Sequence, residues 1–409
     1  MSRLQILAEE FSHVQMAPPD PILSLGVAFK ADKDPSKVNL GIGAYRSEDG
    51  KPYVFPVVKK AQQMVVADPT IDFEYAAIEG DAAFNKGARG VLFGWDHPDV
   101  NSGRVASAQT LSGTGALRVV ADFLAQHRPG AIYLSNPTWG NHNSIFANAG
   151  LAVRDYRYFH AKTKGLDIDG MLEDLKKATP GSCVLLHTCA HNPTGVDPTL
   201  EQWKAIAEVC KERQLYPFFD TAYQGFVSGD LDKDGQGLRY FLSQGFEMVI
   251  AQSFAKVMGL YGERTGALHV VCKTKEVAEK VLSQVKIAIR VNYSSPPKHG
   301  AQIASIILNQ KEMRQQWLNE LVNVTNRMNE MRRLLRKNLE EIGAKGTWEH
   351  VTTQICMFSF TGLTVKQSEA MVNKHHIYMT KNGRISVAGL TKANVPYVAK
   401  AIKDVLETA

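Results

Sequence analysis

The sequence predicts an α/β fold with a mostly parallel central sheet flanked by helices and a smaller α/β domain. Four apolar runs lack the alternation of half-exposed strands, as expected for strands buried on both faces. They are residues 131–134, 184–187, 216–219 and 248–251. Segments with helical periodicity separate them, which is the pattern of a parallel sheet. A chain of 409 residues is too long for one simple core, so a second, smaller domain is expected.

The helices between these runs are predicted from apolar spacing and from their ends. Apolar residues in 117–124 follow an i, i+3, i+4, i+7 pattern that stops at Pro129-Gly130. Asp197 followed by Pro198 is typical of a helix start, and it predicts a helix cap at Asp197. The following helix is expected to turn three residues inward: Trp203, Ala207 and Cys210.

The C-terminal third begins with a long predicted helix. Apolar residues recur every three or four positions from Trp317 to Leu335, and Gly343 ends the pattern. This helix is either a connector into a C-terminal lobe or a surface helix packed on one face. Short strands are expected near 355–360 and 384–387, with a helical stretch between them.

The segment 16–37 is interrupted by several prolines. It therefore predicts an extended arm, rather than a helix, that lies across a neighbouring subunit. The prolines are Pro18, Pro19, Pro21 and Pro35.

Composition excludes several classes of protein. The formal net charge of +6 comes from 47 basic and 41 acidic residues without a basic run, which disfavours nucleic acid as a partner. Five cysteines, an odd number without metal-type spacing, indicate reduced thiols and no metal site. The first residues carry no signal or transit pattern, and no apolar run is long enough for a membrane span. A cytoplasmic protein is expected.

Lys256 is the first candidate catalytic residue. It follows Ser253-Phe254-Ala255, and small and apolar neighbours favour the neutral amine that forms an imine with a carbonyl. Ser253 and Arg264 lie close enough in the sequence to hold an anion beside it. An ordinary solvated lysine after an apolar strand is the alternative.

A second candidate is the sequence Ser112-Gly113-Thr114-Gly115, between an apolar run and a helix. Glycines permit close approach of the backbone, and free N–H groups at a helix N-terminus accommodate phosphate. A turn without any ligand is the alternative. The spacing matches neither the dinucleotide fingerprint nor the P-loop, so a nucleotide-binding fold is disfavoured.

Two further candidates follow predicted strands. Asn192-Pro193 reads as a sharp turn at the carboxyl end of a strand, where open α/β sheets bind ligands. The turn could equally be needed only for its backbone angles. Asp220 ends an apolar strand, so its carboxylate requires a donor unless it caps a helix.

Together these motifs resemble the class I aspartate aminotransferases, in particular their eukaryote-like branch. The matching sequences occur in the family's order: 41–46, 112–115, 137–139 with 141–143, 191–195, Asp220 with Tyr223, 253–256 with Arg264, and 383–385. The resemblance implies a pyridoxal 5′-phosphate enzyme of fold type I that works as a homodimer with shared active sites. It also implies three regions: 1–48 as an arm with part of the small domain, 49–325 as the large cofactor-binding domain, and 326–409 as the small domain.

The resemblance implies a role for each matching residue. Lys256 would bind the cofactor covalently, and Asp220 would keep the pyridine nitrogen protonated. Asn192 and Tyr223 would hydrogen-bond the phenolic oxygen. Trp139 would stack on the ring, although an ordinary core aromatic is the alternative. The phosphate would be held by Ser112, Gly113, Thr114, Ser253, Arg264 and Tyr75 of the partner subunit.

Substrate binding is implied for two arginines. Arg384 would bind the α-carboxylate in a bidentate fork, and Arg290 of the partner subunit would bind the distal carboxylate. Gly43, Trp139 and Asn192 would line the substrate side. His142 and His187 would support Asp220, or would be simply packed histidines.

The function expected from the resemblance is transfer of the amino group from L-aspartate to 2-oxoglutarate. An aromatic or broad-specificity aminotransferase would use the same residues. A non-catalytic protein of this fold is disfavoured by the complete lysine, aspartate and arginine set. A nicotinamide dehydrogenase lacks the glycine fingerprint.

Overall fold

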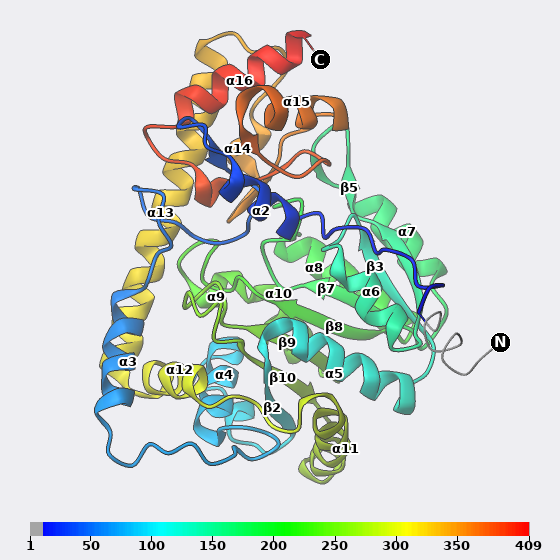
Figure 1. The fold of residues 1–409 in the computed structure, drawn as a ribbon. Coiled ribbons are helices and arrows are strands. Elements are labelled where there is room, and N and C mark those ends of the chain that lie inside the picture. Colours follow the sequence, from blue (N-terminus) through cyan, green and yellow to red (C-terminus); the bar gives the residue numbers. More distant parts are fainter. Residues whose placement is uncertain (1–10, 409) are drawn as a thin grey trace, which may run out of the picture.

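The computed structural model describes residues 11–408, and residues 1–10, which carry part of the expectation about targeting, lie outside them. A seven-stranded sheet has the order β2-β10-β9-β8-β7-β3-β4 (Figure 1). Its strands are β2 (Val105–Leu111), β3 (Ala131–Asn136), β4 (Ala152–Arg157), β7 (Cys183–His187), β8 (Tyr216–Thr221), β9 (Met248–Ser253) and β10 (Thr265–Val271). All are parallel except β10, which runs antiparallel to both β9 and β2. The prediction of a mostly parallel sheet is confirmed.

The sheet is buried on both faces. Phe218 packs in the cluster on one face with Leu117, Leu124 and Val285, whereas its neighbour Phe219 packs on the other face with Trp203. This is why the strand sequences show apolar runs rather than alternation. The first face is covered by α5 (Ser112–His127), α6 (Asn141–Asn148) and α11 (Lys275–Tyr293), and the second by α7 (Ile168–Lys177), α8 (Leu200–Glu212) and α10 (Gln236–Ser243).

The remaining elements complete the chain. They are β1 (Val38–Asn39), α3 (Pro56–Ala67), α4 (Ala82–Phe93), β5 (Phe159–His160), β6 (Gly165–Leu166), α9 (Leu231–Asp234), α12 (His299–Asn309), α14 (His350–Thr353), β11 (Phe358–Phe360), α15 (Val365–His375), β12 (Ile377–Tyr378), β13 (Arg384–Ser386) and α16 (Val395–Thr408), with 3-10 turns at Pro98–Val100 and Val387–Gly389. None of the helices within 11–408 combines the length and apolar character of a membrane span.

The predicted cap at Asp197 is wrong. Thr199 caps α8 instead, because its hydroxyl accepts from the N–H of Gln202 while the Gln202 side chain accepts from the N–H of Thr199. The predicted inward face is correct, since Trp203, Ala207 and Cys210 are buried. Asp197 has a different set of partners, at the Asn192 turn.

The prediction of an extended arm over 16–37 is also wrong in part, because α2 (Leu23–Ala31) is helical. The prolines flank this helix and do not interrupt it, since Pro21 precedes it and Pro35 follows it. The Asp20 carboxylate accepts from the N–H groups of Ile22 and Leu23 and so satisfies donors at its start.

The long helix α13 (Lys311–Glu341) joins two cores. Trp317 and Leu321 pack in the cluster beside the sheet, whereas Met331 and Leu335 pack with residues of β12, β13 and α16. Figure 1 shows α13 running from α3 and α12 to α16. Of the two alternatives for this helix, the connector is therefore the one that the packing favours, since α13 contributes to both cores. The predicted C-terminal strands are β11 and β13, which pair with each other, and α15 lies between them in sequence.

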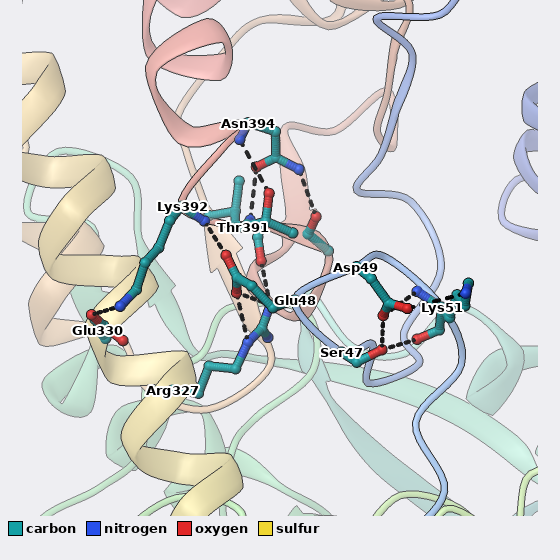
Figure 2. A network of polar contacts seen from close by, with 11 residues as sticks. Ser47, Glu48, Asp49, Lys51, Arg327, Glu330, Thr391, Lys392 and Asn394 are labelled. Carbon is teal, nitrogen blue, oxygen red and sulfur yellow. Dashed lines mark hydrogen bonds and ion pairs between the residues drawn. The ribbon is translucent and has the colours of Figure 1, made fainter.

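The segment that follows residues 41–46 is fixed to α13 and to the turn before α16 (Figure 2). The Glu48 carboxylate accepts from Arg327 Nη2 at 3.0 Å and from the N–H of Lys392 at 2.6 Å. Arg327 also donates to the carbonyl of Leu390, at 2.9 Å. These contacts hold the N-terminal segment against the C-terminal elements.

Candidate active site

The predicted site residues meet at one edge of the sheet. Ser112, Trp139, Asn192, Asp220 and Lys256 follow or end strands that point the same way, so the carboxyl ends of those strands share an edge. Arg264 precedes β10, whose reversed direction brings its start to that same edge. The topology therefore gathers residues that are far apart in the sequence.

These residues surround a cavity of about 240 Å³. The predicted residues that line it are Ser112, Gly113, Thr114, Trp139, Asn192, Asp220, Tyr223, Ser253, Lys256 and Arg264. His187 and Cys189 also line it. Of the other predicted residues, Arg384 and Gly43 do not line it. Arg384 lies 3.4 Å from Asn192, which does, and Gly43 lies against the Phe358 ring. Tyr75 and Arg290 lie elsewhere.

One end of the cavity is suited to an anion. The N-terminus of α5 begins at Ser112, and the Ser112 and Ser253 hydroxyls lie 2.9 Å apart. A side chain at Gly113 would approach the Ser253 Cβ to 3.2 Å, so glycine keeps this corner open. The Arg264 guanidinium has no carboxylate partner within residues 11–408, and Nη1 donates only to the carbonyl of Tyr261. Free N–H groups, hydroxyls and an unpaired cation converge here.

Lys256 lies on the loop after β9, and its Nζ is 5.6 Å from the centre of the Tyr223 ring. Burial lowers the pKa of the Lys256 amine, and the positive charges of Arg264 and Arg384 lower it further, against the opposing effect of Asp220. Burial also raises the pKa of the Tyr223 phenol well above its usual range, so the phenol keeps its proton. The site thus offers an amine shifted toward its neutral form beside a hydroxyl donor.

Asp220 is held by a directional chain of hydrogen bonds. The Asn192 N–H donates to Nδ1 of His187 at 3.2 Å, and burial lowers the pKa of His187 to about 3, so its one proton is on Nε2. That nitrogen faces the Thr138 hydroxyl at 3.4 Å. Thr138 is then free to donate to Nδ1 of His142 at 2.8 Å, and Nε2 of His142 donates to Asp220 at 3.1 Å.

This chain explains the state of the carboxylate. Burial is the largest single effect and would raise the pKa of Asp220, but the hydrogen bond from His142 and the charges of neighbouring groups, including Lys256, together outweigh it and the pKa is lowered. Asp220 therefore remains an anion at the wall of the cavity. Its partner is a side chain and not a helix N-terminus, which excludes the capping alternative. His142 and His187 are hydrogen-bonded members of the site.

Arg384 is a buried cation without a carboxylate partner among the described residues. It is 4% exposed, and its Nη2 donates to the carbonyl of Gly41 at 2.7 Å. Nη1 lies 3.4 Å from Oδ1 of Asn192, and Nε has no hydrogen-bond partner within residues 11–408. Burial lowers the pKa of Arg384 to about 10. The group is available to an anion.

Phe358 is a neighbour of the site that the sequence did not identify. The Arg384 guanidinium stacks over its ring at 4.4 Å, and the ring meets Tyr223 edge to face at 6.0 Å. A side chain at Gly43 would approach the ring to 2.8 Å, so any larger residue there would have to displace the ring. The sequence showed Phe358 only as part of a short strand, since its role depends on distant residues.

Tyr75 and Arg290 share a second cavity, of about 440 Å³, with Ser294 and Ser295. Tyr75 is 85% exposed, and Arg290 is also exposed, with Nη1 donating to Ser294. Neither side chain lines the cavity that contains Lys256. The structure brings the two together with each other and separates them from the lysine of their own chain.

The family described as aminotransferase class I and II matches residues 35–402. The chain belongs to this family. Among curated relatives, the cytoplasmic aspartate aminotransferase of Oryza sativa subsp. japonica is 51% identical, over 96% of this chain and 97% of that protein.

Two solved aminotransferase structures are also similar to this one. The aspartate aminotransferase from Saccharomyces cerevisiae cytoplasm is 40% identical with a TM-score of 0.96, covering 98% of this chain and 99% of that one. The aromatic-amino-acid aminotransferase from Burkholderia pseudomallei, covalently bound to pyridoxal phosphate, is 42% identical with a TM-score of 0.93, covering 97% and 99%.

Aminotransferases of this family depend on pyridoxal phosphate, and the cavity of this aminotransferase fits that cofactor. The α5 N-terminus, Ser112, Ser253 and the unpaired Arg264 suit its phosphate. The Asp220 anion suits a protonated ring nitrogen. Lys256, with its lowered pKa, suits covalent attachment.

Proposed function

We propose that this aminotransferase moves the amino group of L-aspartate to 2-oxoglutarate, giving oxaloacetate and L-glutamate. The observation that carries binding of an amino acid is the buried guanidinium of Arg384, which has no carboxylate partner within residues 11–408 and lies beside the lysine-containing cavity. A planar guanidinium with free N–H groups binds a carboxylate through two hydrogen bonds. The aspartate aminotransferases of Oryza sativa and Saccharomyces cerevisiae support the same substrate.

Bound pyridoxal phosphate supplies an aldehyde that accepts and returns the amino group and a ring that withdraws electrons from the substrate Cα. The protein supplies the remaining groups. The Nζ of Lys256 takes the proton from the substrate Cα, for which the neutral amine is required. Asp220, oriented by His142, would hold a proton on the ring nitrogen. Asn192 and Tyr223 would donate to the phenolic oxygen, and Trp139 would cover the ring.

Orientation and phosphate binding use the other cavity residues. Ser112, Gly113, Thr114, Ser253 and Arg264 would hold the phosphate at the α5 N-terminus, while Arg384 would orient the α-carboxylate. Gly43 leaves room for the Phe358 ring beneath Arg384. Fixing the substrate at its carboxylate keeps the Cα–H bond within reach of Lys256.

We further infer a homodimer with shared active sites. Tyr75 and Arg290 line one hollow, and Tyr75 also lines a neighbouring hollow with Ile71 and Phe73, of which Phe73 is fully exposed. Exposed apolar side chains around a cation are typical of a surface that pairs. In the dimer, Arg290 of the partner subunit would bind the distal carboxylate of the substrate, and Tyr75 of the partner subunit would reach the phosphate.

The division into regions 1–48, 49–325 and 326–409 remains our proposal. It is supported by the separate cluster formed by Val38, Leu40, Met331 and the C-terminal elements. We also propose a cytoplasmic location, for which the cytoplasmic relatives and five buried free cysteines are the support. Localisation of a fluorescent fusion would test it.

An aromatic-amino-acid aminotransferase is the second candidate, since the Burkholderia pseudomallei enzyme is 42% identical to this chain. Absorbance spectra of the cofactor-loaded enzyme distinguish the two. Aspartate should convert the aldehyde form of the cofactor to the amine form at a concentration at which phenylalanine has little effect. Equal conversion by phenylalanine would favour the broad-specificity candidate, and no conversion by either would refute transamination.

A further inference from the structure

Asp197 is a carboxylate near the cavity that is not accounted for by the chemistry above. It lies in the loop before α8, is only partly exposed, and forms no ion pair within residues 11–408. Burial raises the pKa of Asp197 to about 6. An unpaired carboxylate in such a position requires hydrogen-bond donors.

The backbone of the Asn192 turn provides those donors. One oxygen of Asp197 accepts from the Ala190 N–H at 2.6 Å, and the other accepts from the His191 N–H at 2.9 Å. Only a carboxylate, or a group with two acceptor atoms, satisfies both amides at this distance. An asparagine offers one oxygen and would turn its NH₂ group toward the second N–H.

The turn needs such support. Ala190 has a φ of 53°, in the left-handed region that alanine disfavours. His191 is stacked between Tyr158 at 3.8 Å and His187 at 4.2 Å, which fixes its ring. Asp197 accepts from the N–H groups of Ala190 and His191, which precede and follow the strained Cα of Ala190, and so holds this backbone conformation.

Asn192 follows directly, and it makes contacts in two directions. Its N–H donates to His187, which starts the chain of hydrogen bonds to Asp220, and its Oδ1 faces Arg384. Because Oδ1 faces Arg384, the amide NH₂ is turned toward the cavity, where the phenolic oxygen of the cofactor is expected. A shift at residues 190–191 would displace both contacts.

We propose that Asp197 is a positioning residue that holds the 190–191 backbone and thereby sets Asn192 against the cofactor and Arg384. This inference rests on the proposed contact between Asn192 and the phenolic oxygen. Asp197 touches neither cofactor nor substrate, so its effect must pass through Asn192.

The test compares the cofactor-loaded wild type with Asp197→Asn, Asn192→Ala and the double variant. The readout is the pH midpoint of the cofactor's absorbance change, which reports hydrogen bonds to its phenolic oxygen. Asn192→Ala should raise the midpoint by about one pH unit, as for a lost hydrogen bond to a charged group. Asp197→Asn should raise it by part of that amount, and should add nothing when Asn192 is already alanine.

Hydrogen exchange gives a second readout, independent of absorbance. The peptide that contains Ala190 and His191 should exchange faster in Asp197→Asn. Asp197→Glu, which keeps two acceptor oxygens, should have a smaller effect on both readouts and covers the case in which Asp197→Asn does not fold. The control is Asp99→Asn, which removes a buried ion pair with Arg104 away from the turn. It should lower Tm without changing the midpoint.

The outcomes separate the two proposals. An unchanged midpoint and unchanged exchange in folded Asp197→Asn would overturn the role of Asp197. An equal shift in the Asn192→Ala background would also overturn it, because Asp197 would then act elsewhere. If Asn192→Ala itself leaves the midpoint unchanged, the assigned Asn192 contact is wrong, and the exchange rates alone decide whether Asp197 holds the turn.

Discussion

Replacing Arg384 by lysine should cost the enzyme much of its activity while leaving the positive charge in place. A guanidinium has five N–H groups, of which one is directed at the Gly41 carbonyl and one at Asn192. The Nε–H and two further N–H groups are then available to a substrate carboxylate. An ammonium has three N–H groups, so the same two acceptors would leave it one.

The loss is therefore one charge-assisted hydrogen bond and part of the stacking on Phe358. The hydrogen bond contributes about 1.5–3 kcal/mol and a desolvated cation–π contact about 1–2 kcal/mol. Because lysine retains part of the stacking, we expect a total of about 2–4 kcal/mol, or roughly 30- to 1000-fold in kcat/KM.

The assay is steady-state kinetics with aspartate and with alanine as amino donors. Arg384→Lys should lower kcat/KM for both by a similar factor, because both carry an α-carboxylate. Arg290→Lys is the matched control, since it makes the same change at the residue assigned to the distal carboxylate. It should reduce activity toward aspartate and spare alanine.

The reasoning fails if Arg384→Lys changes kcat/KM by less than about threefold in a protein that retains its cofactor and its Tm. It also fails if the loss is confined to aspartate. The first result would mean that the free N–H groups of Arg384 do not meet the substrate, and the second that Arg384 binds the distal carboxylate.

The other predictions concern the lysine, the aspartate, the dimer and pH. Borohydride should fix the cofactor on Lys256, and Lys256→Ala should lose roughly four or more decades of rate; labelling elsewhere contradicts the assignment. Asp220→Ala should lower the activity far more than it lowers the affinity for the cofactor, and an N-methylated cofactor analogue should restore part of the activity. A variant that is only less stable and is not rescued by the analogue would contradict the role of Asp220 at the ring nitrogen. Lys256→Ala and Arg290→Ala subunits, refolded together, should regain about a quarter of wild-type activity, since half the dimers carry one complete site; no recovery with hybrids present refutes shared sites. Because the pKa of Asp197 is raised from 3.8 to about 6, its contribution to stability is present below pH 4 and is lost as pH rises past 6. Relative to Asp197→Asn, the free energy of unfolding of the wild type should fall between pH 4 and pH 6 by no more than about 3 kcal/mol. If denaturant titrations give the same difference between wild type and variant at both ends of this interval, the carboxylate does not titrate with folding.

Sequence patterns predicted the elements whose signals are local. The strands at 216–219 and 248–251 and the helix over 117–124 were correct, because burial on both faces and i, i+3, i+4 spacing depend only on neighbouring residues. The start of that helix was wrong, since the sequence Ser112-Gly113-Thr114-Gly115, expected to precede it, forms its first turn. The helix at Leu23–Ala31 was missed, because prolines around a helix were read as prolines within it.

Long-range contacts limited the prediction of the site. Asp197 and Thr199 are both plausible caps from sequence, and the choice depends on amides at residues 190 and 191 that only the folded turn presents. The role of Phe358 likewise depends on a long-range contact, because its ring stacks with Arg384 of the neighbouring strand in the β11–β13 pair. Family resemblance supplied the roles of Arg384 and Arg290, which no local pattern distinguishes from surface arginines.

Because α13 is long, a small change in its angle moves its ends by a large distance. Its 31 residues extend over about 46 Å at 1.5 Å per residue, with its first half packed beside the sheet and its second half packed with β13, the strand that begins with Arg384. A tilt of about 5° around its middle would displace either end by about 2 Å, close to the difference between a hydrogen bond and no contact. If Arg384 binds the substrate carboxylate as proposed, that contact would depend on the angle of α13, whose first turn lies about 46 Å from its last.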